Sequence, residues 1–571
     1  MVVKRVAPFA FAVAAACTNA AGLPTADPGS HPATTAAIAE PLIGSGPFGL
    51  HPVPAPNPKT PGVPAPNVLP PELVDALVAQ GSIAVENPAT VNLGDGTTAT
   101  VTHYGYDGNG PLLPAPGDLP SASHLVEASK TEPDKNTYLV LYGQTGADPA
   151  YDYGTHFLFQ GHETGTAGYI TRVNLDADGP HRVTILASKD AAGAPLSVID
   201  GSTWDPFAQR LIFTSESTAA AEYQATLGYP SLVEDISGSI GRGGYEGVQN
   251  DSVGNLWIVE DVGGKSATAT PHAKGPNSFV YRFVPKRSDD LTRGKLQVLQ
   301  VISLRTGTPI AFHDAATDTL SPDMADLHAY GKSFDTKWVT IHDTDVDGST
   351  PYDANALAKA KLGTPFKRPE NAQFRPGSGF KEYYFDETGD TNALTEAGAA
   401  YGGFGSVMKL TQASPGANVG KLSLFYLGDV KHSGFDNCGF LSKNQIVFVE
   451  DAGDTLHTQR NALDSGWALD VTLDYSNAAN QPKLFLAEGR DSSATLDSGF
   501  SGMAGFQNEG DNEITGFHVS NGDPSVAGLL GAGIPKPFKG GAWRVFWTQQ
   551  HGDNFTWEIL PSPTAQPLLD E

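Results

Sequence analysis

Short strands that recur along most of the chain are the feature that most constrains its fold. From about residue 88 onward, segments rich in β-branched and aromatic residues alternate with turns rich in Gly, Asn, Asp and Pro. Only residues 354–363 show a helical pattern. Many short strands without alternating helices indicate an all-β protein. We predict strands at residues 137–143, 155–161, 181–187, 210–216, 255–261, 279–285, 337–343, 421–427, 445–451, 482–488 and 543–549.

The length of the chain narrows the all-β class to one architecture. At 571 residues, a β-propeller of about five to six blades with loop insertions is economical, because radial repetition leaves only short, protected sheet edges. Residues 251–257 are typical of a turn that joins two strands within a blade. We therefore expect a propeller over residues 88–571.

A weak internal repeat supports this architecture. Several apolar strands end on carboxylates, at Glu216, Asp261, Asp451 and Glu488. If equivalent strands of successive blades end alike, their carboxylates converge on one mouth of the central channel, where mutual repulsion favours a bound cation. The alternative for any single strand is that a polar residue merely follows it.

The charge of the chain excludes several partners. Lys and Arg total 36 and Asp and Glu total 63, which gives a net charge of −27. Without a basic field, we expect no binding to nucleic acid or to anionic membrane surfaces. An acidic surface suits divalent cations, although it also keeps an exported protein in solution.

The N-terminus predicts export to the periplasm or the extracellular medium. Residues 1–21 combine a charged start, a short apolar stretch and small residues, which is typical of a secretory signal peptide. Cys17 could instead accept a lipoprotein anchor, although the usual Leu is absent. Residues 22–87 are rich in Pro and Ala and predict a linker, with a helical turn or two at 72–80. We expect no membrane span, no disulfide framework and, by default, a monomer.

Local motifs add two candidate sites and no nucleophile. Asp343, Asp345 and Asp347 alternate before Gly348, a spacing that fits either a Ca²⁺ loop or an acidic turn. In residues 368–370 a proline separates an arginine from a glutamate, so the arginine could face an anion and the glutamate a metal; a structural ion pair is the alternative. The sequence contains no nucleophile-elbow, zinc-protease or P-loop motif. His551 comes directly after a predicted strand, a position that fits either a site residue or a surface histidine.

The order of these motifs resembles the PhoX-type alkaline phosphatases, a family of exported proteins. The similarity runs from about residue 104 to 554, and its strongest piece is the Arg-Pro-Glu at 368–370. The other matching pieces are FQGHE at 159–163, RLIFTSES at 210–217, GRGGYEG at 241–247, YRFVP at 281–285, GKL at 294–296, GTPFKRPE at 363–370, EITG at 513–516 and VFWTQQHG at 545–552.

This resemblance implies a propeller whose channel holds Ca²⁺ and Fe³⁺ and hydrolyses phosphate monoesters. It implies that Arg368 contacts the substrate phosphate, without a protein nucleophile. The metal ligands that it implies are Glu216, Glu246 and Glu370, with Glu163, Asp261 and Glu513 as further candidates.

The chain departs from the family pattern at its iron ligand. Where the family has a cysteine about fourteen residues before the Glu of its Thr-Cys-Glu-Glu, this chain has Ser202, and a hydroxyl is a poor substitute for a thiolate. Ser217 replaces the second Glu of that motif, and Cys438 lies far along the chain. Iron is therefore in doubt and calcium is less affected. The alternatives are a calcium-stabilised propeller that binds a partner without catalysis, and another propeller hydrolase such as a lactonase.

Overall fold

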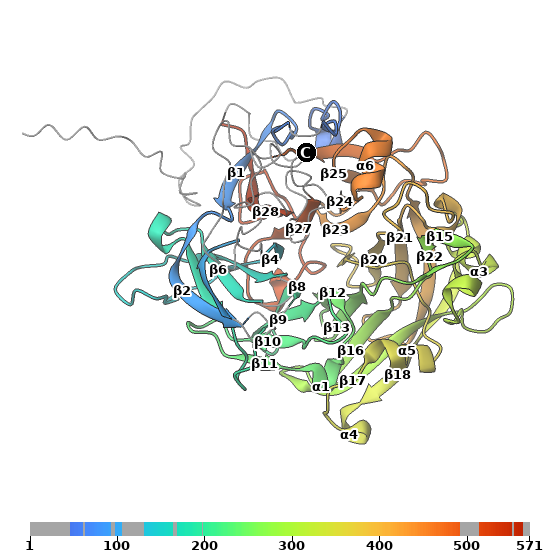
Figure 1. Ribbon diagram of the computed structural model, residues 1–571, viewed down its shortest axis with the longest axis horizontal. Coiled ribbons are helices and arrows are strands. Elements are labelled where there is room, and N and C mark those ends of the chain that lie inside the picture. The colour runs from blue at the N-terminus through green and yellow to red at the C-terminus, as the bar shows by residue number, and fades with distance from the viewer. Residues whose placement is uncertain are drawn as a thin grey trace, which may run out of the picture.

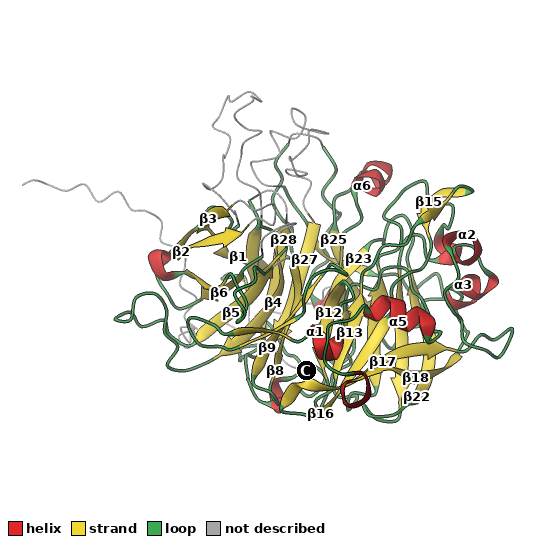
Figure 2. Ribbon diagram, turned by 60° about the horizontal axis from the view of Figure 1, so that its bottom comes forward, coloured by secondary structure: helices red, strands yellow, loops and turns green. Residues whose placement is uncertain are grey.

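The computed structural model describes residues 46–60, 63–92, 98–105, 131–163, 168–196, 198–490, 513–550 and 553–563. Within these ranges the chain is dominated by antiparallel strands, with short helices on the outside of the strands (Figure 2). The predicted signal peptide with Cys17, and His551, lie outside the described residues.

Four separate four-stranded sheets each form one blade (Figure 1). Their strands, from the centre outward, are β4 (Pro133–Val140), β5 (His156–His162), β6 (Ile170–Asn174) and β7 (Val183–Ala187); β8 (Ile199–Asp205), β9 (Arg210–Ser215), β10 (Tyr223–Ala225) and β11 (Val233–Asp235); β23 (Phe435–Phe440), β24 (Gln445–Glu450), β25 (Ser465–Asp470) and β26 (Lys483–Ala487); and β27 (Glu513–Ser520), β28 (Arg544–Gln550), β29 (Phe555–Pro561) and β1 (Leu73–Ala79).

A nine-stranded sheet supplies two further blades. One consists of β12 (Tyr245–Asn250), β13 (Leu256–Glu260), β16 (Val280–Arg287) and β17 (Asp290–Val301), and the other of β19 (Ala372–Phe374), β20 (Glu382–Glu387), β21 (Ser406–Gln412) and β22 (Val419–Leu427). Strand β18 (Phe334–Asp343) pairs with both β17 and β22 and joins the two blades at their outer edges. The predicted all-β propeller is therefore confirmed, with six blades over the described residues.

The blades close into a ring around one channel. The innermost strands contact one another in the order β4, β8, β12, β19, β23, β27 and again β4. Six hydrophobic clusters fill the spaces between neighbouring blades, for example Phe159 and Phe213 between the first two. The burial of apolar side chains between blades holds the inner strands in register around the channel.

The predicted strands are all present, and so is the one predicted helix. Each predicted segment overlaps an observed strand, and α5 (Ala354–Ala360) begins where Asp353 caps it by accepting a hydrogen bond from the backbone of Ala356. The loop between β12 and β13 is the predicted turn, and Asp251 stabilises it by accepting from Val253 N and Asn255 N.

The prediction of a helical turn at residues 72–80 is wrong. These residues form β1, which pairs antiparallel with β29, from Leu73 opposite Pro561 onward. The free edge of β29 offers main-chain partners that override the local helical pattern. Strand β1 falls inside the stretch 22–87 that the sequence predicts to be a linker, and Leu50 and Val53 of the same stretch are buried. The described part of this stretch thus packs into the propeller.

The aspartates near residue 345 form an acidic turn. The short helix α4 (Thr344–Asp347) follows β18, and Asp343 caps it by accepting from Asp345 N. Asp345 pairs with Lys286 and Arg293, and Asp343 pairs with Lys295. Because basic side chains already neutralise two of the three carboxylates, the acidic-turn alternative is favoured over a Ca²⁺ loop.

No helix in the described part of the chain has both the length and the apolar surface that a membrane crossing needs.

Candidate metal centre

A carboxylate stands at or beside the start of every innermost strand. These residues come from six blades and meet at one end of the channel, which we call the acidic mouth. They are Asp134 on β4, Asp200 on β8, Glu246 on β12, Glu370 just before β19, Asp436 on β23 and Glu513 on β27.

Small residues let these strands approach one another closely. Gly201 follows Asp200, and a Cβ atom at Gly201 would lie 1.7 Å from the carbonyl oxygen of Glu246 in the next blade. In the same way, a Cβ atom at Gly247 would lie 2.8 Å from the carbonyl oxygen of Glu370. Neighbouring inner strands therefore touch backbone to backbone, which brings their carboxylates together.

A second set of carboxylates follows the second strand of several blades. Glu163 follows β5, Glu216 follows β9, Asp261 follows β13 and Asp451 follows β24. These side chains lie close enough to affect one another: burial raises the pKa of Glu216, with further contributions from Glu163 and Asp261, and burial also raises that of Glu370, with contributions from Asp261 and Asp451. The strand-end carboxylates thus converge on one mouth, as the internal repeat predicts.

Two consecutive acidic residues stand at the end of β13 and again at the end of β24, and in each pair one side chain faces the blade and the other faces the channel. Glu260 faces into its blade, where its carboxylate accepts from Phe279 N and Asn355 Nδ2, and Glu450 pairs with Arg460. The next residue of each doublet faces the mouth. Glu488 follows β26, the outermost strand of its blade, so it is not equivalent to the others.

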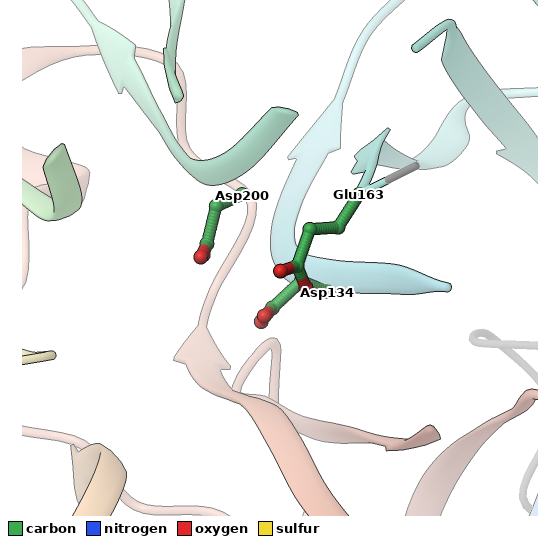
Figure 3. Close-up of side chains that lie close together, drawn as sticks. All are labelled: Asp134, Glu163 and Asp200. Atoms are coloured by element: carbon green, nitrogen blue, oxygen red, sulfur yellow. The ribbon is translucent and has the colours of Figure 1, made fainter. Parts of the chain in front are cut away.

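Two groups of three carboxylates each bring their oxygens within 4.8 Å of one another. The first is Asp134, Glu163 and Asp200; Figure 3 shows the carboxyl groups of Asp134 and Glu163 side by side, with Asp200 facing them. The second is Glu246, Glu370 and Asp436, all of which are buried.

Burial and mutual repulsion raise the pKa of these groups. Burial raises the pKa of Glu163 to about 8, with further contributions from Asp134 and Glu132. Burial also raises the pKa of Asp134 to about 6, against the opposing charge of Lys135. Burial, and then the charge of their carboxylate neighbours, raises the pKa values of Asp200, Glu246 and Asp436 well above the usual range. Such a cluster binds either protons or cations.

The oxygens fit a hard divalent cation. Among the described residues, Asp134 Oδ1 and Asp436 Oδ1 are buried and have no hydrogen-bond donor, which a cation would remedy. Oxygens around Ca²⁺ lie about 2.3–2.6 Å from the ion, so ligands on opposite sides are about 5 Å apart, in keeping with the spread of each group. An all-oxygen donor set suits Ca²⁺ or a similar ion.

Arg368 lies at the acidic mouth, where the carboxylates of Asp261 and Glu370 hold its guanidinium group. Its Nε donates to both carboxylate oxygens of Asp261, at 3.1 and 3.0 Å, and its Nη2 lies 2.9 Å from Asp261 Oδ2 and 2.7 Å from Glu370 Oε1. Among the described residues, Nη1 donates no hydrogen bond, and 16% of the side chain is exposed. An arginine anchored in this way presents its remaining donors in a fixed direction, as oxyanion recognition requires.

A second cation, Lys135, lies deeper in the channel. Its side chain is 2% exposed, and its Nζ donates to Asn437 Oδ1 at 3.0 Å. The positive charge opposes the rise in the pKa values of Asp134 and Asp386. Lys135 therefore neutralises part of the carboxylate charge from within the protein.

The structure gathers the predicted site residues and adds others. Arg368, Glu163, Glu216, Glu246, Glu370 and Asp261 all lie at the acidic mouth, as does Glu513, whose charge raises the pKa values of Glu163 and Asp436. Their roles as ligands stay a prediction. Sequence reasoning missed Asp134, Asp200, Asp436 and Lys135. An acidic residue followed by Gly or Asn at or beside a strand start occurs at 200, 246, 370 and 436, and this signal could have found Asp200 and Asp436.

The thiolate expected for iron has no equivalent at the acidic mouth in the described residues. Ser202 Oγ lies 2.8 Å from Thr137 Oγ1 and donates to the carbonyl oxygen of Lys135, so it bridges two blades. Cys438 is a free, fully buried thiol in the apolar cluster between two blades, and burial raises its pKa well above the usual range. The hydroxyl of Ser217 accepts from Ala219 N. The acidic mouth therefore offers carboxylate oxygens and no thiolate among the described residues.

Comparison with known proteins identifies the fold. No family model and no curated protein sequence matches this chain. Among solved structures, Pseudomonas fluorescens PhoX in complex with vanadate, a transition state analogue, aligns with a TM-score of 0.52 and 10% identity over 89% of this chain and 98% of that one. At this identity the match shows a shared propeller fold.

Two other solved structures align less well. Sqt1 from Chaetomium thermophilum has a TM-score of 0.31 and 8% identity over 76% of this chain and 97% of that chain. The calcium structure of a Trichoderma reesei carbohydrate-active enzyme of family AA12 has a TM-score of 0.24 and 12% identity over 69% and 97%. Neither carries an argument about this protein.

Proposed function

We propose that this protein is a calcium-dependent phosphatase that hydrolyses phosphate monoesters at the acidic mouth. The observation that carries the proposal is the juxtaposition of two carboxylate triads, of which only Glu163 is partly exposed, with Arg368, whose guanidinium is held by Asp261 and Glu370. The PhoX fold and the Arg-Pro-Glu resemblance support the same reaction class. We further propose that the protein is exported, as residues 1–21 predict, and acts on a small phosphate ester.

The residues of the acidic mouth would have different roles in such a reaction. The two triads would hold the cations, and when bound these supply Lewis-acid activation and positive charge at the phosphoryl group. Arg368 would bind a phosphoryl oxygen through Nη1, since Asp261 and Glu370 already occupy Nη2, and would stabilise the charge that develops there. Asp261 keeps the guanidinium oriented, so that little is lost in ordering it when the substrate binds.

The first test is p-nitrophenyl phosphate hydrolysis by protein that begins at residue 22. Activity should disappear in excess EGTA and return when Ca²⁺ is added, because the carboxylates hold the catalytic charge only through the cation. Parallel additions of Mg²⁺ and Fe³⁺ would show whether Ca²⁺ is the ion that restores turnover, and a lactone substrate controls for other hydrolase chemistry.

Absence of turnover with every metal would overturn the phosphatase proposal. Calcium binding without turnover would then favour the non-catalytic, calcium-stabilised propeller. One observation already points in that direction: Ser202, at the position of the family's cysteine, is committed to hydrogen bonds between blades.

A further inference from the structure

The backbone at Arg368 adopts a conformation that needs support. Its φ angle is +58°, in the left-handed region that a residue with a Cβ atom adopts only at an energetic cost. Pro369 follows directly and fixes the next φ angle. Neighbouring structure must therefore hold Arg368 in place.

The end of β20 provides the first support, through the main chain. Lys367 N donates to Glu387 Oε1 at 2.8 Å, Thr388 N donates to the carbonyl oxygen of Arg368 at 2.9 Å, and Gly389 N donates to that of Lys367 at 3.2 Å. Glu387 is itself fixed by His328, whose Nε2 lies 2.9 Å away. Residues 367–368 are thus bonded along their length to residues 387–389.

A buried ion pair provides the second support. Lys367 Nζ donates to both carboxylate oxygens of Asp390 at 3.0 Å, and the two side chains are 1% and 0% exposed. Asp390 also accepts from Lys274 N at 2.9 Å and from Thr395 Oγ1 at 2.5 Å, so it ties three separate segments together. A buried ion pair adds little net stability compared with apolar residues of the same size, because desolvation offsets the attraction. Its value here lies in fixing a geometry.

We propose that the Lys367–Asp390 pair is a positioning device for Arg368 and thereby sets the affinity of the acidic mouth for the phosphoryl group. The inference rests on the proposed phosphatase function. Lys367 acts through the backbone that it shares with Arg368 and contacts neither cation nor substrate. It follows that loosening this pair weakens phosphate recognition and leaves the two carboxylate triads intact.

The test variant is Lys367→Met, which keeps the length of the side chain and removes its charge. Asp390 retains the donors from Lys274 and Thr395, so the remaining carboxylate is not left without partners. In the calcium-loaded full chain, KM for p-nitrophenyl phosphate and the Kd for inorganic phosphate should both rise about tenfold or more, with a smaller change in kcat. The number of bound Ca²⁺ ions should not change.

Arg544→Met is the matched control. Arg544 and Glu558 form a comparably buried ion pair, with side chains 11% and 3% exposed, in the blade that β1 completes. This control should lose stability, as any cut buried pair does, while its KM and phosphate Kd stay those of the wild type. Equal changes in both variants would overturn the inference, because a general structural role would then suffice.

Hydrogen exchange gives a readout that does not need activity. The amides of Lys367 and Thr388, which carry the main-chain support, should exchange faster in Lys367→Met than in Arg544→Met. Faster exchange with unchanged KM and phosphate Kd would overturn the assigned effect on recognition. Unchanged exchange would overturn the positioning role, whether or not the wild-type protein turns over substrate. A lack of turnover in the wild-type protein would instead overturn the phosphatase proposal.

Discussion

Arg368 and Glu370 are two residues apart in the sequence, and their oppositely charged side chains lie next to each other at the acidic mouth. Arg368 bonds to Asp261 and Glu370, and Glu370 also contributes to a carboxylate triad with Glu246 and Asp436. Because Glu370 pairs with Arg368 and, under the proposed function, would also hold a cation, the loss of its charge should affect both.

We expect Glu370→Gln to lower calcium affinity at least tenfold and to abolish phosphatase activity. The amide keeps the shape of the side chain but removes the charge that attracts the ion and pairs with Arg368. Calorimetric titration with Ca²⁺ and turnover of p-nitrophenyl phosphate measure the two effects. Glu222→Gln is the matched control, since Glu222 is equally buried but bonds to Ser215 N within its own blade. Full activity in Glu370→Gln would contradict the proposed site.

At the scale of single residues, sequence reasoning found the side chains that a motif or a strand end marks. It found Glu216, Asp261 and Glu370 in this way. It missed Asp134 and Asp436, because each is the second residue of its strand and its sequence context, Asp-Lys-Asn or Asp-Asn-Cys, resembles an ordinary turn. Only the closure of the ring, which joins residues hundreds of positions apart, makes them neighbours of the others.

At the scale of strands, the approach of one inner strand to the next depends on the absence of a side chain. Gly201 on β8 faces the carbonyl oxygen of Glu246 on β12, and Thr214 Oγ1 donates to that same oxygen at 2.7 Å. The carbonyl oxygen of Glu246 and the hydroxyl of Thr214 therefore fill the space that a side chain at position 201 would need. This contact sets the separation between Asp200 and Glu246, one from each triad.

Gly201→Ala should destabilise the protein by about 1–3 kcal/mol, the usual cost of overpacking, and should weaken calcium binding. The added methyl group forces the two strands apart. Gly228→Ala is the control, because a Cβ atom at Gly228 would meet nothing within 4 Å. Thermal unfolding and calcium titration of both variants check the expectation; equal stability of the two would show that β8 can shift at no cost.

Strands with a periodic apolar pattern could be predicted from the sequence, whereas β1 could not. The segments of β13 and β24 carry dense runs of β-branched and aromatic residues, and their burial on both faces follows from that composition. In β1 only Leu73, Val78 and Ala79 are buried, so its pattern is weak, and its strand partner β29 is the last strand in the described part of the chain. Local sequence carries no information about a partner so distant.

At the scale of the whole molecule, net charge and cation binding are linked. The chain carries a net charge of −27, and part of that charge gathers at the acidic mouth. Without cations the folded protein must either take up protons there or bear the repulsion. Stability in the metal-free state should therefore depend strongly on pH.

Protein treated with a chelator should lose stability as pH rises from about 4.5 to about 8. The folded pKa of Glu163, about 8, and that of Asp134, about 6, both lie above their ordinary values of 4.5 and 3.8. The folded state thus holds more protons than the unfolded state in this window, so stability falls as pH increases through it. Melting temperatures measured from pH 4.5 to 8.5 check this. Ca²⁺ should flatten the curve; an identical slope with and without Ca²⁺ would contradict a cation site at these groups.

The pairing of β1 with β29 also has a kinetic consequence. The contact joins two strands near the extremes of the described residues, so it closes the longest loop among the strand pairings that the structure describes. Folds dominated by such sequence-distant contacts cross their barriers slowly, because chain entropy is lost before the final contacts repay it. On a ribosome, the blade that contains β1 therefore cannot be completed until β29 has been synthesised and has emerged, although β1 emerges long before it.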